Sequence, residues 1–272
     1  MKNFRRVFGL LFIGVLSAGA VPVWAQAIGK VTSVSQGATV TQANATKRLV
    51  SKADIMEGDL IRTDGSGQVQ IVFADRTRVV VGPASELQIE EFTRSTGEKA
   101  SRFAVQAVGG TFRFLTGRSP KAAYELRTPT ATMGIRGTEF DFTVDSRRLT
   151  NLVTFSGEVR ICTRTNSCAR VSGGCAVVTA NRGRIVQPDT PENKASLIVE
   201  NFPFVLSQES LASDYRVRVE SCGEVGKTVT TQTTVPQKSR DRFEGGGDPD
   251  ARGDTRGGDE RGGGYDEGAD EN

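Results

Sequence analysis

Apolar and polar residues alternate along most of the chain between residues 27 and 188. The alternation is clear in Glu86-Leu87-Gln88-Ile89-Glu90, where every second residue is apolar. A period of two is typical of strands that bury one face, and the Gly and Pro residues at 63–67, 82–83, 109–110 and 172–174 suit the turns between them. The pattern predicts strands at residues 30–34, 39–41, 59–62, 67–73, 78–81, 86–92, 103–107, 110–115, 124–127, 138–144, 149–155, 159–163, 169–171, 175–179 and 184–186.

About fifteen short strands at roughly ten-residue spacing leave no room for crossover helices. The sequence therefore predicts an all-β domain at residues 26–188, with its short strands stacked as a sandwich or as a solenoid.

A short helical segment is expected after this domain, within residues 189–235. Thr190 can cap a helix, Pro191 fits its first turn, and Glu192 suits its positive end. The apolar face of the helix consists of Ala195, Ile198, Val199 and Phe202. Pro203 interrupts it, and a strand is expected at 215–219. The segment can pack on the β-domain as a lid, or it can form a groove for a partner.

Residues 236–272 are rich in Gly and charged residues and poor in apolar ones, which predicts a disordered tail. Residues 241–272 hold eleven acidic and four basic residues, so that the tail is acidic and residues 26–240 carry a net charge of +7. The basic residues are scattered singly through strand-like segments, which argues against binding to nucleic acid. The chain contains no His, which excludes His-based nucleophiles, bases and metal ligands.

Residues 1–25 have the pattern of a secretory signal peptide. Lys2, Arg5 and Arg6 precede a short apolar run, and Val23 and Ala25 suit a cleavage site directly after Ala25. The alternative is an uncleaved membrane anchor, but the run is short and is followed by Pro22. Export is expected, without an integral membrane span after cleavage.

Four stretches follow one another in an order that resembles the FecR domain, and a fifth is its most recognisable part. The supporting stretches are residues 53–63, 69–75, 83–87 and 109–114. The strongest is Thr128-Pro129-Thr130-Ala131-Thr132-Met133-Gly134-Ile135-Arg136-Gly137-Thr138-Glu139-Phe140. The resemblance covers roughly residues 30–180, and the sequence departs from it at Asp75-Arg76-Thr77, where the family usually has Asp-Gly. This departure puts the type of that turn in doubt.

The resemblance implies a periplasmic or secreted protein of a Gram-negative-type cell envelope. FecR proteins pass a signal from an outer-membrane transporter to a cytoplasmic sigma factor through a cytoplasmic anti-sigma region. Only six residues precede the apolar run of this chain, so no such region is expected here. The family's role then carries over only as a sensor or interaction module.

The strong stretch also has a physical interpretation as architecture. Pro129 sets an extended entry, Gly134 and Gly137 permit a sharp turn, and Phe140 points inward when the alternation resumes. Arg136, between the two glycines, either ties down loop carbonyls or a neighbouring carboxylate, or contacts a ligand or partner. The signature positions are Thr128, Pro129, Gly134, Ile135, Arg136, Gly137, Thr138 and Phe140.

Cys162, Cys168, Cys175 and Cys222 give an even count, which suits two disulfides in an exported protein. Cys162 and Cys168 can face each other across a hairpin, and this leaves Cys175 for Cys222. A zinc site made of the four cysteines is the alternative, but their spacing lacks the paired knuckles of such sites.

The sequence favours a non-catalytic module without a cofactor, which binds an envelope protein in signalling. The alternatives are an envelope glycan-binding or structural module and, less favoured, a carboxylate-based hydrolase. Glu90 and Glu91 are expected on opposite faces of a strand, where they cannot cooperate. Asp141 and Asp145 share a face and are the other candidates for acid–base chemistry.

Overall fold

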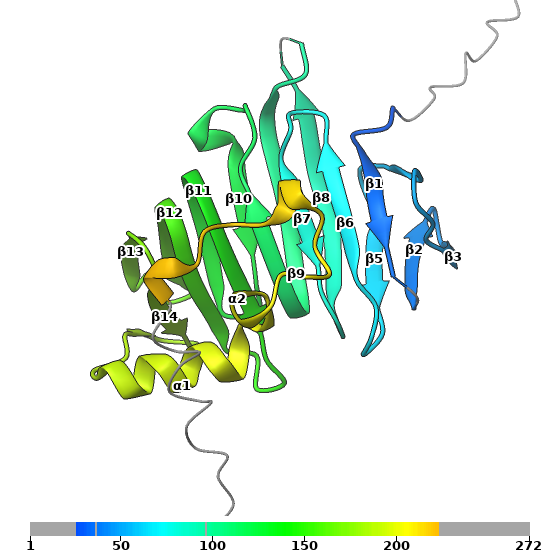
Figure 1. Cartoon of the computed structure of the whole chain (residues 1–272). Coiled ribbons are helices and arrows are strands. Elements are labelled where there is room, and N and C mark those ends of the chain that lie inside the picture. The colour runs from blue at the N-terminus through cyan, green and yellow to red at the C-terminus, as the bar shows by residue number, and fades with distance from the viewer. Residues whose placement is uncertain (1–25, 36, 96, 223–272) are drawn as a thin grey trace, which may run out of the picture. The chain divides into compact units, whose positions relative to one another are not determined.

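The computed structural model describes residues 26–222, apart from 36 and 96 (Figure 1). The predicted signal peptide at 1–25 and the predicted tail at 236–272 lie outside these residues, as does the last part of the predicted helical segment. The described chain is mostly strand, which confirms the all-β prediction. The strands are β1 (Gly29–Val34), β2 (Ala38–Gln42), β3 (Ala45–Arg48), β4 (Asp54–Ile55), β5 (Leu60–Thr63), β6 (Val69–Phe73), β7 (Arg78–Val81), β8 (Glu86–Arg94), β9 (Ala100–Leu115), β10 (Tyr124–Arg127), β11 (Ala131–Val144), β12 (Thr150–Thr163), β13 (Cys168–Ser172), β14 (Ala176–Ala180) and β15 (Ile185–Val186).

All fifteen strands belong to one hydrogen-bonded sheet, but that sheet is folded into two layers. β9, β11 and β12 are long, and the two halves of each pair with different neighbours. Layer 1 has the order β15-β14-β12-β11-β9-β7-β6-β1-β4, and layer 2 has the order β13-β12-β11-β10-β9-β8-β5-β2-β3. Of the two predicted arrangements, the structure is therefore the sandwich.

A single apolar core fills the space between the layers. Phe73 of layer 1 contacts Phe103 of layer 2, with ring centroids 4.6 Å apart. Phe140, at the end of the strongest family-like stretch, is fully buried in the same core, and its ring lies 5.6 Å from that of Phe114. The period-two pattern arises because each strand has one face toward this core and one face away from it.

A glycine in the left-handed region lies at each bend between the layers. Gly110 of β9, Gly137 of β11 and Gly157 of β12 have φ values of 106°, 62° and 75°. The predicted sharp turn at Gly134 and Gly137 is therefore wrong, since β11 is one continuous strand with a bulge after Arg136. The strand pairs predicted at 103–107 and 110–115, and at 149–155 and 159–163, are likewise single bent strands.

Gly157→Ala is expected to lower the free energy of unfolding by about 3 kcal/mol. A Cβ at this position would lie 2.1 Å from the carbonyl oxygen of Gly137, and the backbone φ disfavours any other residue. Urea unfolding followed by circular dichroism measures the change. Gly134→Ala is the matched control in β11, because a Cβ there meets nothing within 4 Å and the backbone is ordinary. Equal losses in the two variants would contradict this explanation.

Residues 191–222, here called the C-terminal strap, cross the outer face of layer 1 (Figure 1, yellow to orange). The strap contains α1 (Pro191–Asn201), α2 (Pro203–Leu206), and the short 3-10 turns η2 (Ser213–Tyr215) and η3 (Glu220–Cys222). Thr190 caps α1 as predicted, accepting a hydrogen bond from the Asn193 backbone N–H at 3.1 Å. The buried side chains of α1 and its C-cap, Ile198 and Phe202, pack in a cluster with outward residues of β12 and β14.

The strand predicted at 215–219 is not formed. This part of the strap crosses the face of the sheet, where the backbone of another strand is out of reach. The Gln208 side chain pairs with it instead: the amide donates to the Val217 carbonyl, and the Val217 N–H donates to Oε1 of Gln208, each at 2.9 Å. Among residues 26–222, apart from 36 and 96, no helix has the length and apolarity that a membrane span needs.

Candidate interaction surface

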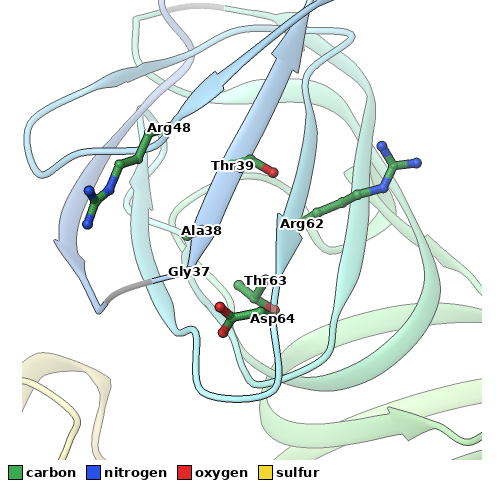
Figure 2. Close-up of a pocket in the computed structure, with 7 residues that line it drawn as sticks. All are labelled: Gly37, Ala38, Thr39, Arg48, Arg62, Thr63 and Asp64. Atoms are coloured by element: carbon green, nitrogen blue, oxygen red, sulfur yellow. The ribbon is translucent and has the colours of Figure 1, made fainter.

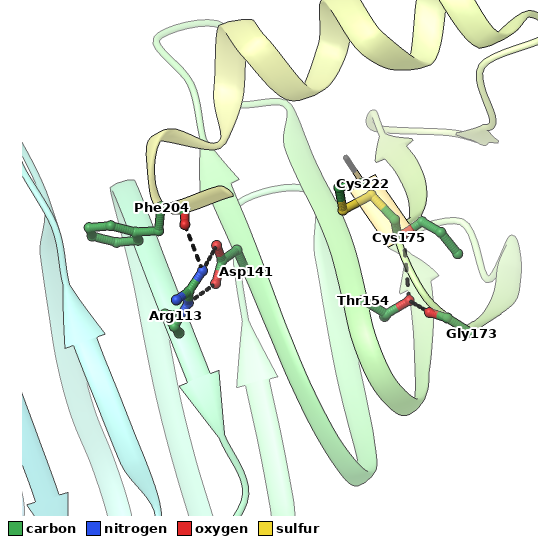
Figure 3. The surroundings of a disulfide bond; sticks show 8 residues. Arg113, Asp141, Thr154, Gly173, Cys175, Phe204 and Cys222 are labelled. Carbon is green, nitrogen blue, oxygen red and sulfur yellow. Dashed lines mark hydrogen bonds and ion pairs between the residues drawn. A yellow bond between two sulfur atoms is a disulfide. The ribbon is translucent and has the colours of Figure 1, made fainter. Parts of the chain in front are cut away.

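A buried ion pair lies where the strap covers layer 1 (Figure 3). Arg113 of β9 and Asp141 of β11 stand directly opposite each other in neighbouring strands, and neither side chain is exposed. Nε and Nη2 of Arg113 donate to the two carboxylate oxygens of Asp141 at 2.7 and 2.9 Å. Burial raises the pKa of the Asp141 carboxyl, and the positive charge of Arg113 opposes that rise.

The remaining N–H groups of Arg113 donate hydrogen bonds to the strap, which covers this ion pair. The guanidinium donates to the backbone carbonyls of Phe204 and Tyr215 at 3.1 and 3.3 Å, and to the Gln208 side chain. It also makes cation–π contacts with the rings of Phe155 and Phe204, 5.3 and 5.6 Å from their centroids. This face of layer 1 is occupied by the protein's own chain, and Asp141 is not accessible to a substrate.

The other carboxylates considered for catalysis also have structural partners. Asp145 holds the turn between β11 and β12, accepting from the Leu149 N–H at 2.8 Å. The prediction that Glu90 and Glu91 face opposite sides of a strand is wrong. A bulge in β8 shifts the register between Ile89 and Glu91, so that both glutamates reach arginines of the outer face of layer 2.

The outer face of layer 2, here called the open face, carries a connected ion-pair network. Arg127 contacts Glu90 at 3.0 Å and Glu125 at 2.7 Å, while Arg102 contacts Glu91 and, at 3.3 Å, Glu125. The hydrogen bond to Glu125 raises the pKa of Arg127. The side chains of this network are exposed or half-buried, in contrast to the closed face of layer 1.

A trough crosses the open face at Gly134, because this position of β11 has no side chain. Gly134 lies between Glu125 of β10 on one side and Arg160 of β12 on the other. The trough has a volume of about 360 Å³ and extends toward Thr132. Its floor, at Gly134, belongs to the stretch that carries the strongest family resemblance, and packing of the core does not explain a glycine at this position.

Arg136 lies on the same strand, two residues beyond Gly134, and is exposed. It stands opposite Glu158 of β12, but makes no hydrogen bond or ion pair with any residue that the structure describes. The predicted role of tying down loop carbonyls or a carboxylate is therefore not seen among these residues.

The other signature residues build the fold. Thr128 and Thr150 are joined by a hydrogen bond of 2.7 Å between their hydroxyls, which fixes the β10–β11 turn to the start of β12. Pro129 lies half-buried in that turn, and Ile135 is in the core. The Thr138 hydroxyl donates to the Glu158 carbonyl at 2.8 Å beside the Gly137 bend.

The unusual turn at Asp75-Arg76-Thr77 keeps the backbone geometry that glycine would adopt. Arg76 has a φ of 72°, in the left-handed region. Asp75 is buried, and its Oδ2 accepts hydrogen bonds from Ser119 and Tyr124, each at 2.7 Å. These bonds hold the turn in place, with an arginine in the left-handed region where the sequence departs from the family pattern.

The four cysteines form two disulfides, Cys162–Cys168 and Cys175–Cys222. The first joins directly opposite residues of β12 and β13, and the second fixes the end of the strap beside β14 (Figure 3). Since all four sulfurs are oxidised, they are not available to bind zinc. Among the described positions, no cluster of three or more Cys, Asp or Glu side chains is arranged to hold a metal ion.

A second hollow lies beside β2 and β5 (Figure 2). Arg48 and Arg62 flank it and point away from each other, and Arg62 is engaged by Glu86 at 2.8 Å. Asp64 caps the following turn by accepting from the Ser66 N–H at 2.9 Å, a bond that lowers the pKa of its carboxyl. The polar groups of this hollow do not converge on a common point, so the Gly134 trough is the better candidate site on the open face.

Comparison with known proteins identifies a domain within the sandwich. Residues 59–160 match the family described as FecR protein. No curated protein matches the chain. Two solved structures, each described as a putative anti-sigma factor from Parabacteroides distasonis, resemble parts of it. One, solved at 2.50 Å, has 18% identity and a TM-score of 0.38, covering 51% of this chain and 63% of its own. The other, at 1.65 Å, has 16% identity and a TM-score of 0.39, covering 64% of this chain and 91% of its own.

The matched family region runs from the start of β5 to the middle of β12, and includes the Gly134 trough and both glycines at the bends of β9 and β11. This chain spans less than two thirds of the first of the two solved structures.

Proposed function

Because the chain carries a FecR domain, we propose that it is an exported, non-catalytic module that binds a protein of the cell envelope in signalling, and that the open face is its binding surface. The observation that carries this proposal is the asymmetry of the sandwich. The strap occupies the outer face of layer 1, whereas the side chains of the open face are exposed or half-buried.

The chemistry of the open face suits a protein partner that binds reversibly. Charged residues of both signs surround the trough, whose floor is the backbone of Gly134. Arg136 is exposed and has no ion-pair partner among the described residues, so it can pair with a carboxylate of a partner. Non-obligate interfaces are about as polar as the rest of a protein surface, and arginine is enriched in them. The two disulfides are consistent with an oxidising compartment outside the cytoplasm.

The test is a crosslinking capture from native envelopes, compared between the wild-type chain and Gly134→Gln. The glutamine extends into the trough, and its Cβ meets nothing within 4 Å. Capture of a specific envelope protein is expected from wild type and is expected to fall about tenfold in the variant, which corresponds to about 1.4 kcal/mol of binding energy.

Gly65→Gln is the matched control, since that glycine lies in the β5–β6 turn and is equally unobstructed. It should capture the same protein as wild type. Undiminished capture by Gly134→Gln would show that the partner binds elsewhere. Retention of envelope glycan alone, with no specific protein, would replace the signalling role by a glycan-binding or structural one.

A further inference from the structure

Five arginines gather at one edge of the sandwich, on β12, β13 and the turns that follow β12 and β14. They are Arg160, Arg164, Arg170, Arg182 and Arg184, here called the arginine edge. All five are exposed, and none forms an ion pair with another described residue. Glu158 is the sole acidic residue between positions 150 and 188. This edge therefore holds positive charge that the described part of the chain does not neutralise.

Two of these arginines lie directly opposite each other on neighbouring strands. Arg160 and Arg170 are direct cross-strand partners in β12 and β13. The disulfide-linked pair Cys162 and Cys168, two residues further along, has a Cα–Cα distance of 4.1 Å, as in a non-hydrogen-bonded pair. Arg160 and Arg170 also form a non-hydrogen-bonded pair, because pair types alternate along the two strands. In pairs of this type the opposite side chains are closest. Like charges in such a position repel each other, and carboxylates of a partner beside them would reduce the repulsion.

The arginine edge is also rigidly built. The Cys162–Cys168 disulfide closes the β12–β13 hairpin. The Thr165 hydroxyl of that hairpin donates to the Gly183 carbonyl of the β14–β15 turn at 3.0 Å, which joins the two arginine-bearing turns. The backbone positions of the arginines are thus set before a partner binds, which lowers the cost of binding.

Within the described part of the chain, β13 pairs with β12 alone, which leaves its other flank without a neighbouring strand. The backbone groups of Cys168, Arg170 and Ser172 face that flank, because residues of non-hydrogen-bonded pairs direct their N–H and C=O groups away from the partner strand. These groups make no backbone hydrogen bond to another described residue. The edge thus offers a strand-pairing surface next to the arginines.

We propose that the arginine edge binds an extended, acidic polypeptide segment of the partner, which adds to β13 as a further strand and places its carboxylates against Arg160 and Arg170. This inference rests on the proposed function as a protein-binding module and adds the chemistry of the partner. Arginine forms paired hydrogen bonds with carboxylates, and all five cations of the edge are arginines. The same charges oppose pairing of β13 with the β13 of a second copy.

A membrane surface fits the arginine edge less well. The two turns that carry Arg164, Arg182 and Arg184 contain no large apolar residue that could enter a bilayer. A lipid headgroup would also leave the backbone groups of β13 without partners.

The test uses the full chain and a fluorescein-labelled peptide of twelve residues in which Glu and Val alternate, with binding followed by anisotropy. Binding that weakens with added salt is expected, together with an at least tenfold loss in the double variant Arg160→Glu/Arg170→Glu. The matched control is Lys47→Glu/Arg48→Glu, the same charge change on β3, the edge strand at the other end of layer 2. It should bind the peptide like wild type.

Two further probes separate strand addition from simple charge attraction. The same peptide with alternate residues N-methylated keeps its carboxylates but loses backbone donors, and it should bind at least tenfold more weakly. Equal binding of the methylated peptide would overturn strand addition, and stronger binding to phosphatidylglycerol vesicles than to the peptide would overturn the assignment of a polypeptide. Because these assays use purified components, their failure leaves the Gly134→Gln capture result standing as a separate test of the proposed function.

Discussion

Arg113→Ala is expected to lower the free energy of unfolding by about 3–5 kcal/mol, among the largest effects of any single substitution in this chain. The substitution leaves the Asp141 carboxylate without its bidentate partner, in a position with no exposure to water. It also removes the donor for the Phe204 and Tyr215 carbonyls, and with it the contact that fixes the middle of the strap. Urea unfolding at pH 7 measures the loss.

The loss in Arg113→Ala should depend on pH in a defined direction. Burial already raises the pKa of Asp141, and without the arginine the folded state would retain the proton to still higher pH. The folded variant then binds more protons than the unfolded chain above the unfolded-state pKa of about 3.9. Stability of the variant should therefore fall, relative to wild type, as the pH rises above about 4.

The double variant Arg113→Met/Asp141→Leu is the control that separates charge from packing. Replacement of a buried ion pair by apolar residues of similar volume is often neutral or stabilising, so the double variant should be more stable than Arg113→Met or Asp141→Leu alone. Additive losses would show that the pair acts through shape alone. A loss below about 1 kcal/mol in Arg113→Ala would contradict the buried placement of Asp141.

Removal of the Cys175–Cys222 disulfide by alanine substitution of both residues is expected to cost about 4 kcal/mol, from the chain entropy of the loop that it closes. That loop has a sequence separation of 47 residues and includes the whole strap. The Cys162–Cys168 disulfide closes a separation of 6 residues, and its removal should cost about 2 kcal/mol on the same scale.

The two cysteine variants are each other's control, since both remove one disulfide from the same chain. Urea unfolding of both gives the difference directly, and hydrogen exchange should show that the Cys175/Cys222 variant loses protection first in the strap. An equal or reversed order of the two losses would show that the Cys175–Cys222 bridge does not hold the strap on the sheet.

Neither the buried ion pair nor the open face could be predicted from the sequence, for different reasons. Phe112-Arg113-Phe114 and Phe140-Asp141-Phe142 have the same form, a charge between two aromatic residues, and this signal could have suggested a pair. The pairing nevertheless depends on the register between β9 and β11, which places two residues opposite each other that are 28 positions apart in the sequence. The outer face of layer 2 is open because the strap packs on layer 1 instead. The apolar face of the helix in the strap predicts that this face is buried, but it does not predict which layer covers it.

The local pattern by itself determined most of the strands, the Thr190 cap and the stretch that resembles the FecR family, because each depends on residues close together in the chain. Only the tertiary structure decided that Gly110, Gly137 and Gly157 bend continuous strands between two layers, since a left-handed glycine serves equally in a turn or in a bend. It also decided that Glu90 and Glu91 share a face, through a bulge that depends on the partner strand. The alternation at 215–219 was not enough to form a strand, because a strand needs a neighbouring backbone, and this segment lies across a face whose backbone bonds are already made.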